Sequence, residues 1–201
     1  MYKCIFMILA LNLSICDLDA QVSKAQMVDS LKLMLKNYKH NCSSPCLKDS
    51  FKVNLLNDLG FYFSSLKLDS GIAYARQGML LSEQIGWLRG KTDALVKIGD
   101  FLRLKGENDS SLFYNAKVLE ICERTGCRDN SLYLNKGVAY YTSGLVERDN
   151  GNIPKALNYL EKALSIFNEL KDLRRISNSY SGMGIAYESI GRYGEIGRAH
   201  V

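Results

Sequence analysis

The chain has 201 residues, of which 47% are hydrophobic and 23% are charged, and it contains only two prolines. A chain this apolar can bury a sizeable core, which argues against intrinsic disorder. The formal charge of +5 is spread along the sequence. It therefore lacks the clustered basic stripe that nucleic-acid binding usually needs, and we expect one folded domain with no nucleic-acid partner.

Residues 1–20 have the organisation of a secretory signal peptide. Lys3 provides a basic start, residues 4–16 form an apolar stretch, and Ala20 offers a small residue at a cleavage site. The apolar stretch is too short to span a membrane as a helix. We expect cleavage after Ala20 and export of the mature chain.

A lipid anchor is the alternative interpretation of this segment. Leu13–Cys16 resembles a lipobox, the motif in which a cysteine becomes lipidated. Ile15 stands where that motif has Gly, Ala or Ser. Cleavage after Ala20 therefore ranks first.

Residues 21–50 are predicted to form a capping helix and a loop that contains cysteines. The helix is expected over residues 23–40, with one apolar face. That face comprises Met27, Leu31, Met34, Leu35 and Tyr38. Terminal units of helical arrays need one polar outer surface, so this helix is expected to cap an array.

Export would place the cysteines that follow the signal peptide in an oxidising compartment, where disulfides form. Cys42 and Cys46 lie close together in the predicted loop and are expected to form a bridge. Cys122 and Cys127 straddle a predicted helix end, and Cys122 also suits a small buried position. Neither pair has the two-residue spacing typical of zinc sites, so we expect no metal.

The sequence repeats itself from residue 51 to residue 194. Intervals of 7 and then 5 residues separate small residues at recurring positions. These residues are Gly99, Gly106 and Ser111, then Gly144, Gly151 and Ala156, and then Gly184 with Gly191 beginning another copy. A fixed internal period is typical of stacked helix pairs. The prediction is an all-α solenoid of antiparallel helix pairs, about three and a half repeats long.

Small residues also recur where the second helix of each pair is expected to pack. Helices that cross closely need small side chains where their backbones approach. Gly71, Ser111 and Ala156 occupy one such site, and Gly78, Val118 and Ala163 occupy the site seven residues later.

The predicted pairs cover residues 54–66 with 70–85, then 90–125, and then 130–170. An excess of five residues between Gly126 and Gly144, compared with the equivalent earlier link, predicts a longer first helix in the third pair. The expected helix ends are Asp69 and Asp109 as N-caps, Pro154 in a first turn, and Gly86 and Gly126 as C-caps.

No catalytic constellation stands out in the sequence. His40 and His200 are the two histidines, and no nucleophile, base and orienting residue come together around either. The glycines follow the repeat rather than a phosphate-binding motif after a strand. We therefore expect no enzyme activity and no cofactor in this chain.

Several segments resemble one family. Lys52–Asn57, the Asp-Ser pairs that begin at Asp69 and Asp109, Ile85–Gly86 and Asp149–Leu157 are similar to exported tetratricopeptide repeat (TPR) regions of Bacteroidetes signalling proteins. In that family such arrays typically precede a membrane helix and a histidine kinase, a nucleotide cyclase or a LuxR-type DNA-binding domain. The resemblance covers nearly all of residues 24–194. It implies a TPR superhelix in the periplasm, with any kinase or cyclase activity in a missing C-terminal domain.

Residues 195–201 are expected to be an artefact. The second helix of a fourth repeat should follow Tyr193, but Glu195–Val201 resembles the translation of a common sequencing adapter. We therefore expect the array to be truncated at its C-terminus. Membrane attachment would occur only through a missing C-terminal span or a lipid anchor.

The first helix of each pair lines the concave face of such arrays, and this rule selects the candidate partner-binding residues. They are Asn57, Phe61, Ser64, Asp93, Val96, Asp100, Arg103, Val138, Tyr141, Leu145, Arg148, Asn178, Ser181 and Ile185. Aromatic and aliphatic residues stand beside a few charges, a mixture that suits a peptide or a helix. The predicted function is protein binding or sensing at the input end of a larger signalling protein. The alternative is a free-standing periplasmic or lipid-anchored scaffold for envelope proteins.

Overall fold

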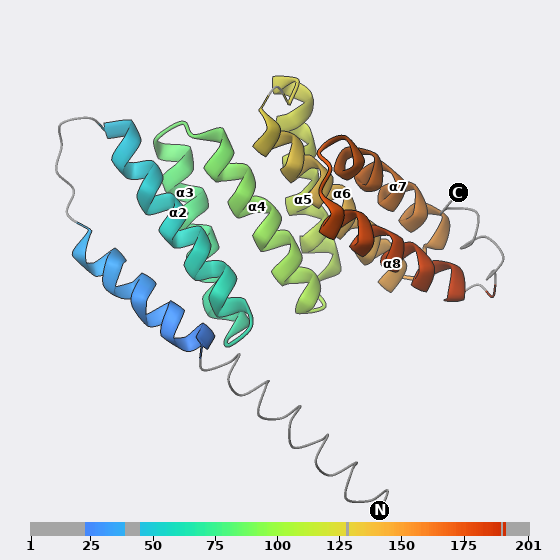
Figure 1. The fold of residues 1–201 in the computed structure, drawn as a ribbon, viewed down its shortest axis with the longest axis horizontal. Coiled ribbons are helices and arrows are strands. Elements are labelled where there is room, and N and C mark those ends of the chain that lie inside the picture. Colours follow the sequence, from blue (N-terminus) through green and yellow to red (C-terminus); the bar gives the residue numbers. More distant parts are fainter. Residues whose placement is uncertain (1–22, 39–44, 128, 190, 192–201) are drawn as a thin grey trace, which may run out of the picture.

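The computed structural model describes residues 23–38, 45–127, 129–189 and 191, and every regular element in these ranges is an α-helix (Figure 1). A first helix covers residues 23–37. The remaining helices are α2 (Pro45–Ser64), α3 (Leu68–Gln84), α4 (Leu88–Leu104), α5 (Asn108–Thr125), α6 (Asn130–Asp149), α7 (Ile153–Glu169) and α8 (Leu173–Ser189). The predicted all-α class is confirmed.

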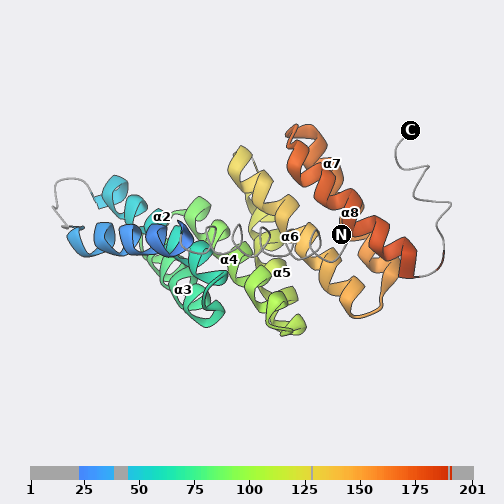
Figure 2. The same ribbon diagram turned by 60° about the horizontal axis from the view of Figure 1, so that its bottom comes forward.

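The helices stack in chain order as pairs, α2 with α3, α4 with α5, and α6 with α7. Across the pairs, each second helix contacts the first helix of the next pair, and the first helices also contact one another, α2 with α4, α4 with α6, and α6 with α8. Among the described helices, the backbones of α3, α5 and α7 do not come close to one another. Because the first helices approach one another and the second helices do not, the first helices form the inner, concave side. Figures 1 and 2 show the array extending from the first helix at one end to α8 at the other.

One type of tight turn recurs between the helices. After α4, the Gly106 N–H donates to the Arg103 carbonyl at 2.9 Å and the Glu107 N–H donates to the Leu102 carbonyl at 2.9 Å. The φ of Gly106 is +82°, in the left-handed region that glycine adopts without strain. The same pair of bonds follows other helices, with Gly86, Gly151 and Lys171 at the left-handed position.

These turns correct two of the predicted helix starts. Asp69 and Asp109 are not N-caps, because α3 begins after Lys67 and α5 begins after Glu107. The tight turn closes within three residues, so the next helix starts earlier than expected. Both aspartates lie in the first turn instead, where a negative charge is favourable for the helix dipole. Pro154 lies in the first turn of α7, as predicted.

Helix lengths show where the five extra residues of the third pair go. The helix α6 has 20 residues and α4 has 17, which confirms the longer first helix. The other two extra residues lie between the turn glycine Gly126 and the start of α6. In the first pair, α2 begins at Pro45 rather than at Asn54. The helix therefore includes residues 45–50, which were expected to belong to a loop.

The first helix packs with a face that overlaps the predicted one at Leu31, Leu35 and Tyr38 but does not include the two methionines. Val28 and Leu31 are buried against α2, and Leu35 is partly buried beside them. Met27 and Met34 are 44% and 46% exposed. The packing stripe therefore lies one position away from the methionines, at a spacing of three and four residues.

The predicted small-residue sites lie at the contacts within the helix pairs. A Cβ atom added to Gly71 would lie 2.8 Å from the Gly60 carbonyl oxygen and 3.0 Å from the Ser64 nitrogen. In the second pair the Ser111 hydroxyl donates to the Gly99 carbonyl at 2.7 Å. Small side chains are thus required because the two backbones nearly touch.

No helix among the described residues is both long enough and apolar enough to cross a membrane.

Candidate functional site

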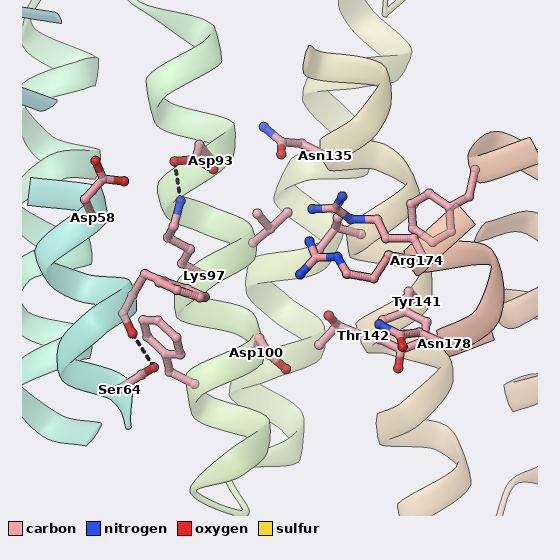
Figure 3. Close-up of a pocket in the computed structure, with 16 residues that line it drawn as sticks. Asp58, Ser64, Asp93, Lys97, Asp100, Asn135, Tyr141, Thr142, Arg174 and Asn178 are labelled. Carbon is pink, nitrogen blue, oxygen red and sulfur yellow. Dashed lines mark hydrogen bonds and ion pairs between the residues drawn. The ribbon is translucent and has the colours of Figure 1, made fainter. Parts of the chain in front are cut away.

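A groove of about 400 Å³ opens along the concave side of the array (Figure 3). It is bordered by α2, α4, α6 and α8, the first helices of successive pairs, and α7 adds one residue. The lining comprises Asp58, Phe61, Ser64, Asp93, Val96, Lys97, Asp100, Phe101, Asn135, Val138, Tyr141, Thr142, Phe167, Arg174, Arg175 and Asn178.

The groove has an apolar floor and an exposed aromatic side chain at one side. Val96, Phe101 and Phe167 are buried at the floor, with exposed fractions of 4%, 3% and 1%. Phe61 on α2 is 56% exposed, and Tyr141 on α6 is half-buried. The site therefore offers apolar contact area that remains accessible from solvent.

Polar side chains connect the inner helices next to the groove. The Asn57 amide on α2 donates to the Asp93 carboxylate of α4 at 3.0 Å and to the Gly90 carbonyl at 3.2 Å. On the other side of α4, the Asn135 amide of α6 donates to the Thr92 hydroxyl at 3.0 Å. These bonds hold neighbouring pairs together on the concave side.

The charges of the groove are unevenly distributed. The carboxylates Asp58, Asp93 and Asp100 come from α2 and α4, whereas the guanidinium groups of Arg174 and Arg175 come from α8. In Figure 3 the labelled aspartates stand on the α2 and α4 helices and Arg174 lies across the groove from them. Lys97 on α4 also lines the groove, so the α2 and α4 side carries three acidic groups and one basic group, and the α8 side carries two basic groups.

The surroundings of the groove shift the pKa of two lining residues, Asp58 and Tyr141. Partial burial raises the pKa of Asp58, the positive charge of Lys97 opposes that effect, and the negative charge of Asp93 adds to it. Burial likewise raises the pKa of Tyr141, with Arg103 opposing the change. The tyrosine hydroxyl therefore stays protonated at neutral pH and can donate a hydrogen bond.

The structure brings together a large part of the predicted partner-binding set. The predicted residues that line the groove are Phe61, Ser64, Asp93, Val96, Asp100, Val138, Tyr141 and Asn178. Arg103 bonds Asp100 at 3.3 Å and Asp149 at 3.6 Å beside the groove, and Arg148 bonds Asp149 at 2.7 Å. Ser181 and Ile185 are exposed on α8 outside the lining. Their role in partner binding remains a prediction.

Two of the predicted residues face the interior instead. Asn57 is 1% exposed because its amide bonds α4, and Leu145 is 7% exposed because it packs against Leu160 and Met183. Neither side chain is accessible to a partner. The rule that selected them identified the correct helices but not the direction in which each side chain points from the helix axis.

Several lining residues were missed by sequence reasoning. Lys97 lies four residues after Asp93 on the stripe that runs along α4, and Arg174 lies four residues before Asn178 on α8. Widening the α4 stripe by one residue would have found Lys97, and extending the α8 stripe by one turn would have found Arg174. Phe167 belongs to a second helix, so no rule confined to first helices could include it.

The other candidate sites are a possible metal site, the cysteines and the histidines. No group of three or more His, Cys, Asp or Glu side chains in the described part of the chain is arranged to hold a metal. Cys122 and Cys127 are unbridged, and burial, followed by the contact with Cys127, raises the pKa of the Cys122 thiol to about 12. The predicted Cys42–Cys46 bridge, His40 and His200 lie outside the described side chains.

Comparison with known proteins agrees with this architecture. Residues 135–196 match the family model of the tetratricopeptide repeat. A search of curated proteins finds no match to the chain.

Three solved structures have similar folds. BtubC (BKLC) from P. vanneervenii has a TM-score of 0.68 at 12% identity, with 88% of this chain and 70% of that chain covered. MamA has a TM-score of 0.53 at 18% identity, with 90% and 86% covered. A putative kinesin light chain with nearly identical TPR-like repeats, from Podosopora anserina, has a TM-score of 0.59 at 11% identity, with 87% and 82% covered. The predicted solenoid of TPR-type helix pairs is confirmed.

Proposed function

We propose that the groove binds an extended segment of a partner protein. The observation that carries this proposal is the accessible apolar lining on the inner helices, with Phe61 56% exposed above a floor of buried side chains. An aromatic contact combined with separate charges gives a peptide both affinity and register.

The chain contains a close internal control for a test. Phe61 on α2 and Phe113 on α5 are both 56% exposed. Phe61 stacks edge-on against Tyr62 at 5.4 Å, and Phe113 against Tyr114 at 5.6 Å. Only Phe61 lies in the groove, whereas Phe113 lies on an outer helix. Phe61→Ala and Phe113→Ala therefore remove similar exposed aromatic side chains, one from the groove and one from the outer side of the array.

The experiment is selection of random nonapeptides by phage display on the mature chain, followed by fluorescence anisotropy of the enriched peptides. We expect Phe61→Ala to weaken their binding at least tenfold, and Phe113→Ala to leave it within twofold. Equal losses in the two variants would show that the peptides bind elsewhere. Urea unfolding of both variants checks that each remains folded.

We further propose that this binding is the input step of an exported signalling protein. Support comes from the signal-like residues 1–20 and from the resemblance to TPR regions of signalling proteins. The bonds from Asn57 to Asp93 and from Asn135 to Thr92 join inner helices beside the groove. A ligand that prefers one spacing of these helices would shift the packing of successive pairs.

Export and signalling need separate tests. Fractionation of a tagged chain in a bacterial host, with and without residues 1–20, would place the full chain outside the cytoplasm and the shortened chain inside it. Long-read sequencing of the source gene beyond the codon for Gly194 tests the signalling role. A membrane span and an output domain would support it, and a stop after one more helix would favour a scaffold for envelope proteins.

A further inference from the structure

The inference that follows concerns the chemistry of the partner segment, and it rests on the proposed peptide-binding function. Its starting point is the separation of charge in the groove. Most of these charges have partners within the protein. Asp93 bonds Lys97 at 2.5 Å, Asp100 bonds Arg103 at 3.3 Å, and Arg175 bonds Asp172.

Two exposed charges of opposite sign remain without an ion-pair partner among the described residues, namely Asp58 and Arg174. Asp58 lies on α2, where Lys97 is near enough to influence its ionisation but forms its short bond with Asp93 instead. Arg174 extends from α8 into the groove (Figure 3). Arg174 likewise helps to lower the pKa of Asp172, whose ion pair is with Arg175. Each charge is exposed in the free protein and loses its remaining water when a segment covers it. A covered charge then needs an opposite charge on the ligand.

We propose that the groove selects a partner segment with a cationic side chain at one end and an anionic side chain at the other, separated by apolar residues. The cationic group pairs with Asp58 and the anionic group pairs with Arg174. The apolar residues between them cover Val96, Val138 and Tyr141, which lie on the helices between the two charges.

The spacing of the helices sets the length of this segment. Helices pack about 8–10 Å apart, so α2 and α8, three steps apart along the inner side, are separated by about 24–30 Å. An extended chain advances about 3.3 Å per residue, so about seven to nine residues span this distance. The two ligand charges are therefore expected about five to seven positions apart, because the long Arg174 side chain shortens the gap.

The same two charges also disfavour peptides whose end charges do not match them. A segment with two basic ends would leave Arg174 covered without a partner and facing a like charge, and a segment with two acidic ends would do the same to Asp58. Such mismatches penalise the wrong ligand more than correct pairs favour the right one.

The test compares the peptides selected by three single variants and the unmodified chain. Nonapeptide libraries are selected in parallel on the unmodified protein, on Arg174→Glu, on Asp58→Lys and on Arg76→Glu, a control on the outer helix α3. The unmodified protein and Arg76→Glu should both enrich peptides with one basic and one acidic residue. Arg174→Glu should enrich peptides basic at both ends, and Asp58→Lys peptides acidic at both ends.

A representative peptide with opposite charges at its ends provides the quantitative check. Its binding should weaken about tenfold in Arg174→Glu and be unchanged in Arg76→Glu, and 0.5 M salt should reduce the difference. If enriched peptides depend on Phe61 but show the same charges on every variant, the charge-selection proposal is overturned and peptide binding stands. If no variant enriches any peptide, both proposals are overturned.

Discussion

The seam between the inner helices and the contacts within each pair are built from different chemistry. Along the seam, hydrogen bonds from Asn57 and Asn135 reach across to α4. Within the pairs, glycine and other small residues let two backbones approach, as at Gly71 against Gly60. Close backbone approach is thus the feature of the contacts within a pair, whereas polar bonds on the concave side add to the apolar contacts that join one pair to the next.

Buried asparagines show this contrast most directly. The Asn57 amide nitrogen bonds two acceptors across the seam. Asn115, which is fully buried between α4 and α5, has no partner among the described residues for either polar side-chain atom. The equivalent position is Ala75 in the first pair and Leu160 in the third. At this position the contact within a pair therefore requires no polar group.

The largest expected effect comes from the closest backbone approach. In Gly71→Ala the new Cβ would meet backbone atoms of Gly60 and Ser64, which cannot rotate away. We expect a loss of about 3 kcal/mol in the free energy of unfolding. Gly184→Ala on α8 is the control, because nothing described lies within 4 Å of its added Cβ. That variant should gain about 0.5–1 kcal/mol from helix propensity, and urea unfolding measures both. A neutral Gly71→Ala would contradict the close contact.

Breaking the seam should cost less. Asn57→Ala removes both hydrogen bonds that this side chain donates from α2 to α4, to the Asp93 carboxylate and to the Gly90 carbonyl. The expected loss is about 2 kcal/mol in the free energy of unfolding. Small-angle scattering should also show a change in the curvature of the array, because α2 and α4 lose a direct bond. A loss of stability with unchanged scattering would limit the role of this bond to stability.

A carboxylate on α6 gives a prediction that depends on pH. Glu147 is 2% exposed, and although burial alone would raise its pKa, hydrogen bonds from Lys155 at 2.5 Å and Asn152 at 2.9 Å lower it. Its stabilising contribution is therefore present above about pH 4.5 and is lost as the pH falls through the lower pKa of the folded state.

The measurement is the pH dependence of urea unfolding in Glu147→Gln. The variant should lose about 1 kcal/mol at pH 7 and have a shallower acid dependence than the unmodified protein. Asp172, whose pKa is likewise lowered in the folded state by Arg175 despite the opposing effect of burial, should keep part of that dependence. Identical slopes in the two proteins would show that Glu147 does not contribute.

The last predicted effect is a gain of stability rather than a loss. Asn115→Ala removes two unpaired polar atoms and places at this position the side chain that the first pair already has, Ala75. Relief of the unsatisfied polar atoms should exceed the cost of the small cavity, giving a gain of about 1 kcal/mol. Thermal unfolding checks the sign, and a lower melting temperature would mean that the amide has a partner.

Sequence reasoning predicted the elements better than the site. The glycine intervals identified the pairs and the longer first helix of the third pair, because close helix contacts require small residues at fixed positions in the sequence. Phe61, Asp93 and Tyr141 were predicted for the groove because the first helices alternate regularly along the chain. Arg174 was missed, because the predicted stripe on α8 began one turn later, at Asn178, and only the superhelical path shows that the first turn of α8 also reaches the groove.

The sequence by itself determined the helix pairs, their order and their turns, since small residues, proline and left-handed glycines act locally and recur at a fixed period. Only the tertiary structure decided which side chains of the inner helices are accessible, burying Asn57 and Leu145 and leaving Phe61 exposed. It also decided that charges distant in sequence, such as Asp58 and Arg174, line one groove. The physical reason is that accessibility and charge placement depend on the small rotation between successive pairs, which adds up along the array.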